Sequence, residues 1–314
     1  MKTSLQHIHI EDFITQNGKA YAVPLSYQIF GKPLHTAPVV LVNHALTGNS
    51  DVAGENGWWK TLVGKRKPID TEHFTILAFN VPGNGYDGFF MDNYEDFTAS
   101  DIAQIFLLGL KKLNIHRLEI LIGGSVGGSI AWEMLVKSPD LAHIFVPVAT
   151  DFKTTDWLYS QCLVQKFLLE NTTEPMQKAR IHAMLCYRTP ESLNHRFKRE
   201  KINENGLWKS HDWLNYHGRA LDQRFDIQAY RLMNHLLMTI DADEKLLPEI
   251  TADIHLISVD SDLFFPDFEI KKCYEALKPK KPNVHFHQIK SIHGHDAFLM
   301  EYEQLAEIFK KIIF

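Results

Sequence analysis

One serine in the middle of the chain stands in a glycine-rich setting that could make it a nucleophile. The sequence from Gly123 to Gly128 is GGSVGG, which contains the pattern GxSxG around Ser125. A β-branched apolar run precedes it and helical apolar spacing follows it, so we expect a strand, a tight turn and a helix. Glycines suit such a turn because larger side chains would collide with the strand and helix. A glycine-rich phosphate loop is disfavoured because GxGxxG and GxxxxGK are both absent here.

A serine is a weak nucleophile at neutral pH, so this prediction requires a base and an acid elsewhere in the chain. After such a turn the acid is expected next and the histidine last. Two candidates exist for each role: Asp260 and Asp262 follow one apolar run, and His293 and His295 follow the next. All four lie beyond the carboxyl ends of predicted strands, where open α/β sheets build their sites. Position in the loop modestly favours Asp262, whereas periodicity does not choose between the histidines.

The elements that would position these residues alternate between strands and helices. Short apolar runs predict strands at residues 39–43, 74–80, 118–123, 144–148, 254–259 and 284–289. Apolar spacing near 3.6 residues predicts helices at 100–113 and 302–313, the first capped by Thr98 or Ser100. Residues 152–246 have helical periodicity and no convincing buried strand. We therefore expect an α/β protein with a mostly parallel sheet flanked by helices and an inserted helical lid.

This pattern divides the chain into three segments. Residues 1–151 and 251–314 would form the first and second parts of the core, and residues 152–250 would form the lid insertion. A single interrupted domain of this kind accounts for a length of 314 residues, which exceeds the size at which domains are most common.

Composition excludes several other classes of protein. The chain is 45% apolar and 23% charged, which disfavours disorder, and its net charge of −5 offers no broad basic surface for nucleic acid. We find no signal-peptide pattern and no apolar run of about 18 residues, so we expect a cytoplasmic protein without membrane contact. Cys162, Cys186 and Cys273 lack CxxC spacing, and we expect buried free thiols. Three HxH pairs have no third ligand at metal spacing, so no metal site is expected.

Several motifs, in order along the chain, resemble those of one family. They are HALTG at residues 44–48, GWW at 57–59 with KPIDT at 67–71, GGSVGG at 123–128, SDLFFP at 261–266 and GHDAFL at 294–299. From about Val39 to the C-terminus the chain resembles the homoserine O-acetyltransferases of methionine biosynthesis, which have the α/β-hydrolase fold. Several such motifs in the right order are more specific than one GxSxG alone.

The resemblance implies roles for individual residues. It makes Ser125 the nucleophile, Asp262 the acid and His295 the base, and it gives the oxyanion hole to the backbone N–H groups of Leu46 and Val126. The substrate-binding residues that it implies are Arg180, Tyr187 and Asp296. Arg180 would bind the substrate carboxylate with Tyr187 nearby, and Asp296 would bind the substrate amino group, as a zwitterionic amino acid requires.

The implied reaction is ping-pong transfer of an acetyl group from acetyl-CoA to the hydroxyl of L-homoserine, with acetyl-CoA as a substrate and no cofactor. A homodimer through the lid is implied as well. Succinyl-CoA as donor remains an alternative, and so does a serine esterase, because the same triad hydrolyses esters when water reaches the acyl-enzyme. A catalytically inactive binding module is a third, remote alternative. A buried Arg180 paired with Asp296 across a deep tunnel would favour an amino-acid acceptor, and an open apolar groove would favour an esterase.

Overall fold

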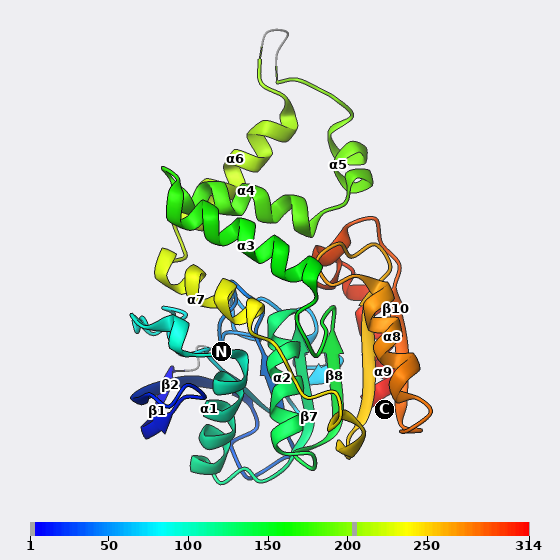
Figure 1. Ribbon diagram of the computed structural model, residues 1–314. Coiled ribbons are helices and arrows are strands. Elements are labelled where there is room, and N and C mark those ends of the chain that lie inside the picture. Colours follow the sequence, from blue (N-terminus) through cyan, green and yellow to red (C-terminus); the bar gives the residue numbers. More distant parts are fainter. Residues whose placement is uncertain (1–3, 203–205, 314) are drawn as a thin grey trace.

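The computed structural model describes residues 4–202 and 206–313 and is built around an eight-stranded sheet. The strand order is β1-β2-β6-β3-β7-β8-β9-β10 (Figure 1). Their bounds are β1 Gln6–Ile14, β2 Ala20–Gly31, β3 Val39–Asn43, β6 Thr75–Phe79, β7 Leu118–Gly124, β8 Ala142–Val148, β9 Asp253–Val259 and β10 Val284–Ile289. The neighbouring strands from β6 to β10 pair in parallel, whereas the pairs β1–β2 and β2–β6 are antiparallel. A separate two-stranded sheet joins β4 (Val63–Gly64) to β5 (Ile69–Asp70).

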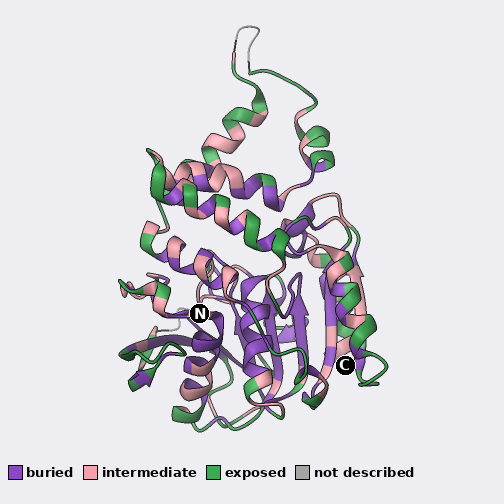
Figure 2. Cartoon of the chain, viewed as in Figure 1, coloured by how far each residue is buried: buried purple, intermediate pink, exposed green. Residues whose placement is uncertain are grey.

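The two faces of the main sheet support separate hydrophobic cores. Because side chains alternate along a strand, Leu41 of β3 points into one core and Val40 and Val42 point into the other. The first core is packed by α1 (Ala99–Lys112), α2 (Val126–Lys137) and α8 (Asp267–Leu277), and the second by α9 (Tyr302–Ile313). With both faces covered, β3 and β6 are buried along their whole length, as Figure 2 shows for the centre of the sheet.

Between β8 and β9, five helices in the described part of the chain form a lid over the carboxyl ends of the parallel strands (Figure 1). Their bounds are α3 Asp156–Asn171, α4 Pro175–Tyr187, α5 Pro190–Phe197, α6 Lys209–Asp222 and α7 Ile227–Met238. Helix α4 packs against both α3 and α6, and α7 packs against α3. The outward faces of these helices are exposed (Figure 2). The described residues also include the 3₁₀ helices η1 Tyr94–Asp96, η2 Leu247–Glu249 and η3 Gly294–Leu299.

The predicted fold class is confirmed, and the six predicted strands correspond to β3, β6, β7, β8, β9 and β10. Thr98, rather than Ser100, caps α1, because its side chain accepts from the Asp101 backbone N–H in a capping box. The N-terminal strands β1 and β2 were not among the predicted strands. The three cysteines are buried and free. No helix among the described residues is long and apolar enough to cross a membrane.

The predicted segment boundaries fall in connecting loops. The first, after residue 151, lies between β8 and α3, and the second, after residue 250, lies between η2 and β9. Of the three predicted segments, residues 1–3, 203–205 and 314 lie outside the described residues.

His44, directly after β3, joins two of the loops at the carboxyl edge of the sheet. Its Nδ1 lies 2.8 Å from the carbonyl oxygen of Ala45, so Nδ1 must be the protonated, donating nitrogen. Its Nε2 accepts from the backbone N–H of Val81, 3.0 Å away, beyond the end of β6. A ring that accepts at Nε2 is neutral, and burial lowers the pKa of His44 to about 4. The imidazole therefore ties the loop after β3 to the loop after β6 only while it is uncharged.

This contact predicts a loss of stability in acid. Since the pKa of His44 is about 4 in the folded chain and 6.5 for a solvated histidine, the unfolded state binds the proton more readily. The contribution of His44 is fully present above pH 6.5 and declines as the pH falls towards 4, by about 3 kcal/mol at 1.36 kcal/mol per pKa unit. Urea denaturation between pH 7 and pH 4 should give His44→Gln, which cannot titrate, a shallower decline than the wild type by about that amount. If the free energy of unfolding fell equally with pH in the two proteins, His44 would not be the source of the acid sensitivity.

Candidate active site

The turn between β7 and α2 holds Ser125 in a backbone conformation that residues other than glycine rarely adopt. Its φ is 54° and its ψ is −131°, outside the regions favoured by L-residues. A residue in such a conformation costs on the order of 1–3 kcal/mol, and the surrounding structure must hold it there. The strained turn projects the serine from the end of a buried strand, at the first turn of a helix. Ser125 therefore occupies the kind of position that a nucleophile requires.

The glycines around Ser125 are required by close backbone contacts. A Cβ at Gly127 would lie 2.5 Å from the carbonyl oxygens of both Asn43 and His44 at the end of β3. A Cβ at Gly123 would lie 2.4 Å from the backbone of Gly127, across the turn itself. These separations are shorter than real Cβ contacts, so α2 can approach β3 and β7 this closely only with glycine at these places.

Ser125, His295 and Asp262 form a chain of hydrogen bonds. Ser125 Oγ lies 2.9 Å from His295 Nε2, and His295 Nδ1 lies 2.7 Å from Asp262 Oδ2. All three residues are buried, with exposed fractions of 3–4%. In this order a carboxylate orients the imidazole, and the imidazole can take the hydroxyl proton from the serine. The three residues come from three loops at the carboxyl edge of the sheet.

Asp262 is fixed by backbone groups as well as by the histidine. Its Oδ1 accepts from the N–H groups of Phe264, at 2.7 Å, and Phe265, at 2.9 Å. The rings of both phenylalanines also pack against the imidazole of His295. The carboxylate and the imidazole thus lie in an apolar enclosure, where electrostatic interactions are stronger than in water.

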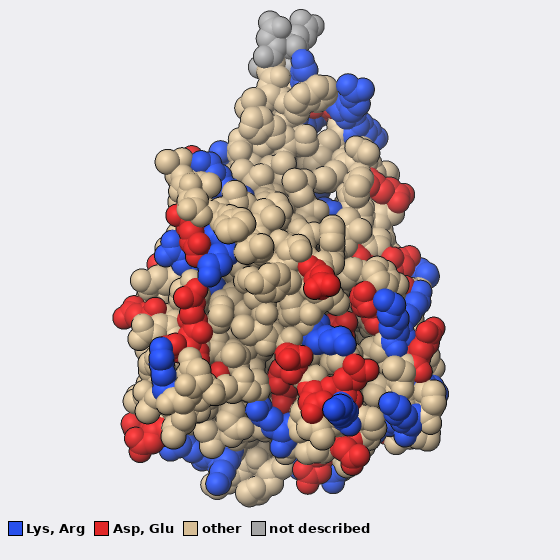
Figure 3. All heavy atoms as spheres, viewed as in Figure 1, with Lys and Arg blue, Asp and Glu red and all other residues tan. Residues whose placement is uncertain are grey.

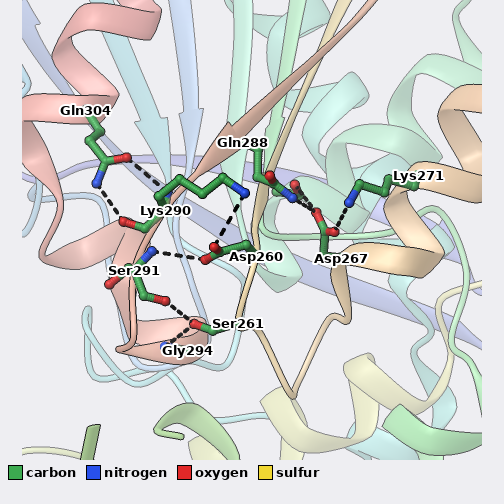
Figure 4. A network of polar contacts seen from close by, with 10 residues as sticks. Asp260, Ser261, Asp267, Lys271, Gln288, Lys290, Ser291, Gly294 and Gln304 are labelled. Carbon is green, nitrogen blue, oxygen red and sulfur yellow. Dashed lines mark hydrogen bonds and ion pairs between the residues drawn. The ribbon is translucent and has the colours of Figure 1, made fainter. Parts of the chain in front are cut away.

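The other two candidates for acid and base have different contacts. Asp260 accepts from the backbone N–H of Ser291, at 3.0 Å, and forms an ion pair with Lys290 (Figure 4). His293 Nδ1 accepts from Ser192 Oγ and Arg188 Nη1, both on the lid side. Neither side chain contacts Ser125 among the described hydrogen bonds.

A polar network joins the loop that carries Asp262 to the loop that carries His295. Ser261 Oγ donates to the carbonyl oxygen of Ser291 and accepts from the backbone N–H of Gly294. Gln304, on α9, exchanges two hydrogen bonds with the backbone of Lys290, at 2.9 and 3.0 Å (Figure 4). These contacts fix the separation of the two loops, so that Asp262 and His295 keep their hydrogen-bond distance.

Two backbone N–H groups are available to stabilise negative charge beside Ser125. Among the residues that the structure describes, no hydrogen bond is made by the N–H of Leu46 or of Val126. Val126 is the first residue of α2, whose dipole places positive potential at that end. Leu46 lines the same pocket as Ser125. Free donors of this kind are what an oxyanion hole consists of.

The pocket above Ser125 combines an apolar wall with two charged residues. Arg180, Tyr187 and Asp296 line it together with Ser125 and His295. It encloses about 70 Å³, which is room for only a few water-sized groups since one water needs about 10–15 Å³. The Arg180 guanidinium carbon lies 5.7 Å from the centre of the Tyr187 ring. Burial raises the pKa of Tyr187 well above its usual value, so its hydroxyl is protonated at neutral pH.

Asp296 pairs with an arginine that the sequence analysis did not assign to the site. Its Oδ2 lies 2.7 Å from Nε of Arg188, at the end of α4. Arg180 lines the same pocket as Asp296 but does not reach its carboxylate, which the residue after Tyr187 contacts instead. Arg188 lies in the same lid segment as Arg180, but 108 positions before Asp296, and no local pattern predicts contact over that interval.

The part of the chain that the structure describes offers no cluster that would hold a metal ion. Among residues 4–202 and 206–313, no three His, Cys, Asp or Glu side chains are arranged as metal ligands. His285 and His287 lie on β10 beside His255 of β9, and His255 Nδ1 is 3.1 Å from His287 Nε2. These rings stack on one another at the edge of the sheet rather than converge on a point.

The chain is similar in sequence to known proteins along nearly its whole length. A homoserine O-acetyltransferase of Deinococcus radiodurans is 29% identical over 308 residues, which cover 95% of this chain and 88% of that protein. A homoserine O-acetyltransferase of Methanococcus vannielii is 28% identical over 96% of this chain and 71% of that protein. The resemblance inferred from the sequence motifs is thus confirmed.

Solved structures resemble the chain in fold. The crystal structure of esterase E22 is 16% identical and covers 98% of this chain and 99% of that one, with a TM-score of 0.87. A family model described as the alpha/beta hydrolase fold matches residues 38–302. The sheet order, the strained serine turn and this match together establish that the chain belongs to the alpha/beta hydrolase fold family.

Proposed function

We propose that this chain is an acyltransferase that moves an acetyl group from acetyl-CoA to the hydroxyl of L-homoserine. The observation that carries the proposal is the pairing of a Ser–His–Asp chain with two charged residues, Arg180 and Asp296, in one small pocket. The homoserine O-acetyltransferases to which the chain is similar along nearly its whole length support the same reaction.

In the first half-reaction Ser125 is the nucleophile. His295 takes the proton from Ser125 Oγ as the oxygen attacks the thioester carbonyl, and Asp262 stabilises the imidazolium that forms. The N–H groups of Leu46 and Val126 receive the negative charge on the carbonyl oxygen. The carbon–sulfur bond then breaks, and the CoA sulfur takes the proton from His295. The product is an acetyl ester on Ser125.

In the second half-reaction the hydroxyl of an amino acid attacks the acetyl ester on Ser125. The guanidinium of Arg180 binds the acceptor carboxylate, beside the ring of Tyr187. Asp296 binds the acceptor ammonium with the oxygen that Arg188 leaves free. The acceptor hydroxyl gives its proton to His295 as it attacks the acetyl ester, and that proton returns to Ser125 when the ester bond to the enzyme breaks. Arg188 acts as a positioning residue, because it orients the carboxylate without contacting the acceptor.

The charges of the pocket favour this reaction over the hydrolysis of apolar esters. An esterase for apolar esters would need neither Arg180 nor Asp296, although esterase E22 has the same fold. The triad chemistry needs no metal or cofactor, and acetyl-CoA takes part as a substrate.

Homodimerisation through the lid is part of this proposal. The exposed side chains of Trp157, Val164 and Phe167 follow one another along α3, and Leu185 of α4 is exposed as well. In Figure 3 the lid presents a largely uncharged surface, whereas acidic and basic side chains gather over the core. An apolar surface of this kind favours contact with a second copy. The buried free thiols are consistent with a cytoplasmic location.

The dimer can be tested by placing a charge on this surface. We expect the wild-type chain to have twice the mass of one chain by light scattering after size exclusion, and Phe167→Asp to have the mass of one chain. Asn114→Asp, which adds the same charge on the core, should leave the dimer intact. A wild-type monomer, or a Phe167→Asp dimer as stable as the wild type, would contradict the proposed interface.

The nucleophile can be identified by mass. Incubation with acetyl-CoA and no acceptor should add one acetyl group to the intact wild-type protein, and peptide mapping should locate it on Ser125. Ser125→Ala should stay unlabelled. In turnover assays acetyl-CoA should outperform succinyl-CoA, and homoserine should outperform serine and the water blank. A wild type that never labels, or a label that survives in Ser125→Ala, would overturn the first half-reaction.

The acceptor subsite should separate the two half-reactions. Because a hydrogen bond to a charged group contributes about 1.5–3 kcal/mol, Arg180→Ala should raise the homoserine KM roughly ten- to hundredfold. Arg188→Gln should raise the same KM by a smaller factor, because Asp296 loses its orienting contact. Labelling of Ser125 by acetyl-CoA should proceed in both variants. Lys178→Ala, on the same helix, is the control, and an equal effect of Arg180→Ala on both half-reactions would show that Arg180 is misassigned.

A further inference from the structure

A second cavity lies beside the active-site pocket and shares one wall with it. It encloses about 260 Å³, and Thr47 lines both cavities. Thr47 directly follows Leu46, whose backbone N–H faces the reaction in the proposed mechanism. The two cavities therefore adjoin at Thr47. Nothing in the proposed mechanism so far uses this space.

Arg224, just after α6, is the basic residue of this second cavity. Its Nη1 donates to the carbonyl oxygen of Thr47, at 3.2 Å, and its Nη2 donates to Thr47 Oγ1, at 3.3 Å. These bonds use two of the five guanidinium N–H groups. Among the described residues no carboxylate forms an ion pair with Arg224. Asp226 lines the same cavity, but its Oδ1 accepts from the backbone N–H of Gln228 as the cap of α7.

A second arginine stands close to Arg224 without a counter-charge. Burial and then the positive charge of Arg180 lower the pKa of Arg224. Arg180 likewise has no carboxylate partner among the described ion pairs, because Asp296 is held by Arg188. Two like charges near one another at adjoining cavities are unfavourable until anions bind between or beside them. The proposed acceptor has only one carboxylate, and Arg180 binds it.

The other residues that line the cavity are suited to binding the part of an acyl donor that carries its anionic group. Tyr86 and Phe90 also line the cavity. Aromatic side chains together with a guanidinium are groups that bind nucleotides and phosphates. Resting on the proposed function, we propose that this cavity binds the acyl donor, with Arg224 holding an anionic group of that donor. The anion is either a phosphate of CoA or the terminal carboxylate of a dicarboxylic acyl group.

The position of Arg224 fits a donor subsite rather than an acceptor subsite. Its two hydrogen bonds to Thr47 fix the guanidinium against the loop that carries the Leu46 N–H. A donor anchored there would direct its thioester carbonyl towards the oxyanion hole and Ser125. In the proposed reaction the acceptor binds to Arg180 and Asp296 in the first pocket, so donor and acceptor need not compete for the same cation.

Arg224→Ala tests this subsite, with Arg219→Ala as the matched control. Arg219 lies on the exposed side of α6, outside both cavities. The rate of Ser125 acylation is measured against concentration for three donors: acetyl-CoA, succinyl-CoA and p-nitrophenyl acetate, which carries no anionic handle. We expect the ratio of the KM of at least one thioester to the p-nitrophenyl acetate KM to rise at least tenfold in Arg224→Ala, and both ratios to stay unchanged in Arg219→Ala.

The three donors distinguish the two sources of the anion. A rise for both thioesters identifies a CoA phosphate, and a rise for succinyl-CoA alone identifies the acyl carboxylate. If neither ratio moves, or if all three donors change together, Arg224 does not bind a donor anion and the inference is overturned. If wild-type Ser125 accepts no thioester at all, the proposed function fails, which is a separate result from an unchanged Arg224→Ala.

Discussion

The close approach of α2 to the end of β3 is the constraint on which the rest of the site depends. Gly127 allows it, since a Cβ there would lie 2.5 Å from the carbonyl oxygens of Asn43 and His44. That approach brings the loop after β3, with the free N–H of Leu46, beside the strained turn at Ser125. The packing of the buried strands around the turn holds it in this strained conformation. A nucleophile and its oxyanion donors are thereby held in place before any substrate arrives.

In the proposed mechanism, the fate of the acyl-enzyme depends on charges supplied by the lid. Arg188 holds Asp296 by a 2.7 Å contact, while Arg180 has no carboxylate partner among the described residues. Arg180 and Asp296 give the pocket one cation and one oriented carboxylate, which in the proposed reaction match the two charges of an amino acid. In the proposed mechanism these lid residues, rather than Ser125 and His295, select the attacking group.

Much of this arrangement could be predicted from the sequence, and the failures have physical reasons. GxSxG between an apolar run and helical spacing predicted the turn at Ser125, because that turn is a local feature. The parallel strands were recognisable since burial on both faces gives continuous apolar runs. The N-terminal strands β1 and β2 were missed because they are partly exposed and lack such runs. The partner of Asp296 was missed because Arg188 reaches it only through the packing of the lid, which no spacing along the chain encodes.

The fate of the isolated acyl-enzyme tests the central claim most directly. Acetyl-Ser125 protein, freed of donor by rapid gel filtration, would be mixed with homoserine or with buffer alone, and its mass followed with time. We expect homoserine to remove the acetyl group far faster than buffer does and O-acetyl-homoserine to appear in equal amount. Release of acetate at the same rate with and without homoserine would contradict this expectation, because the lid charges would then select no acceptor and the protein would be a hydrolase.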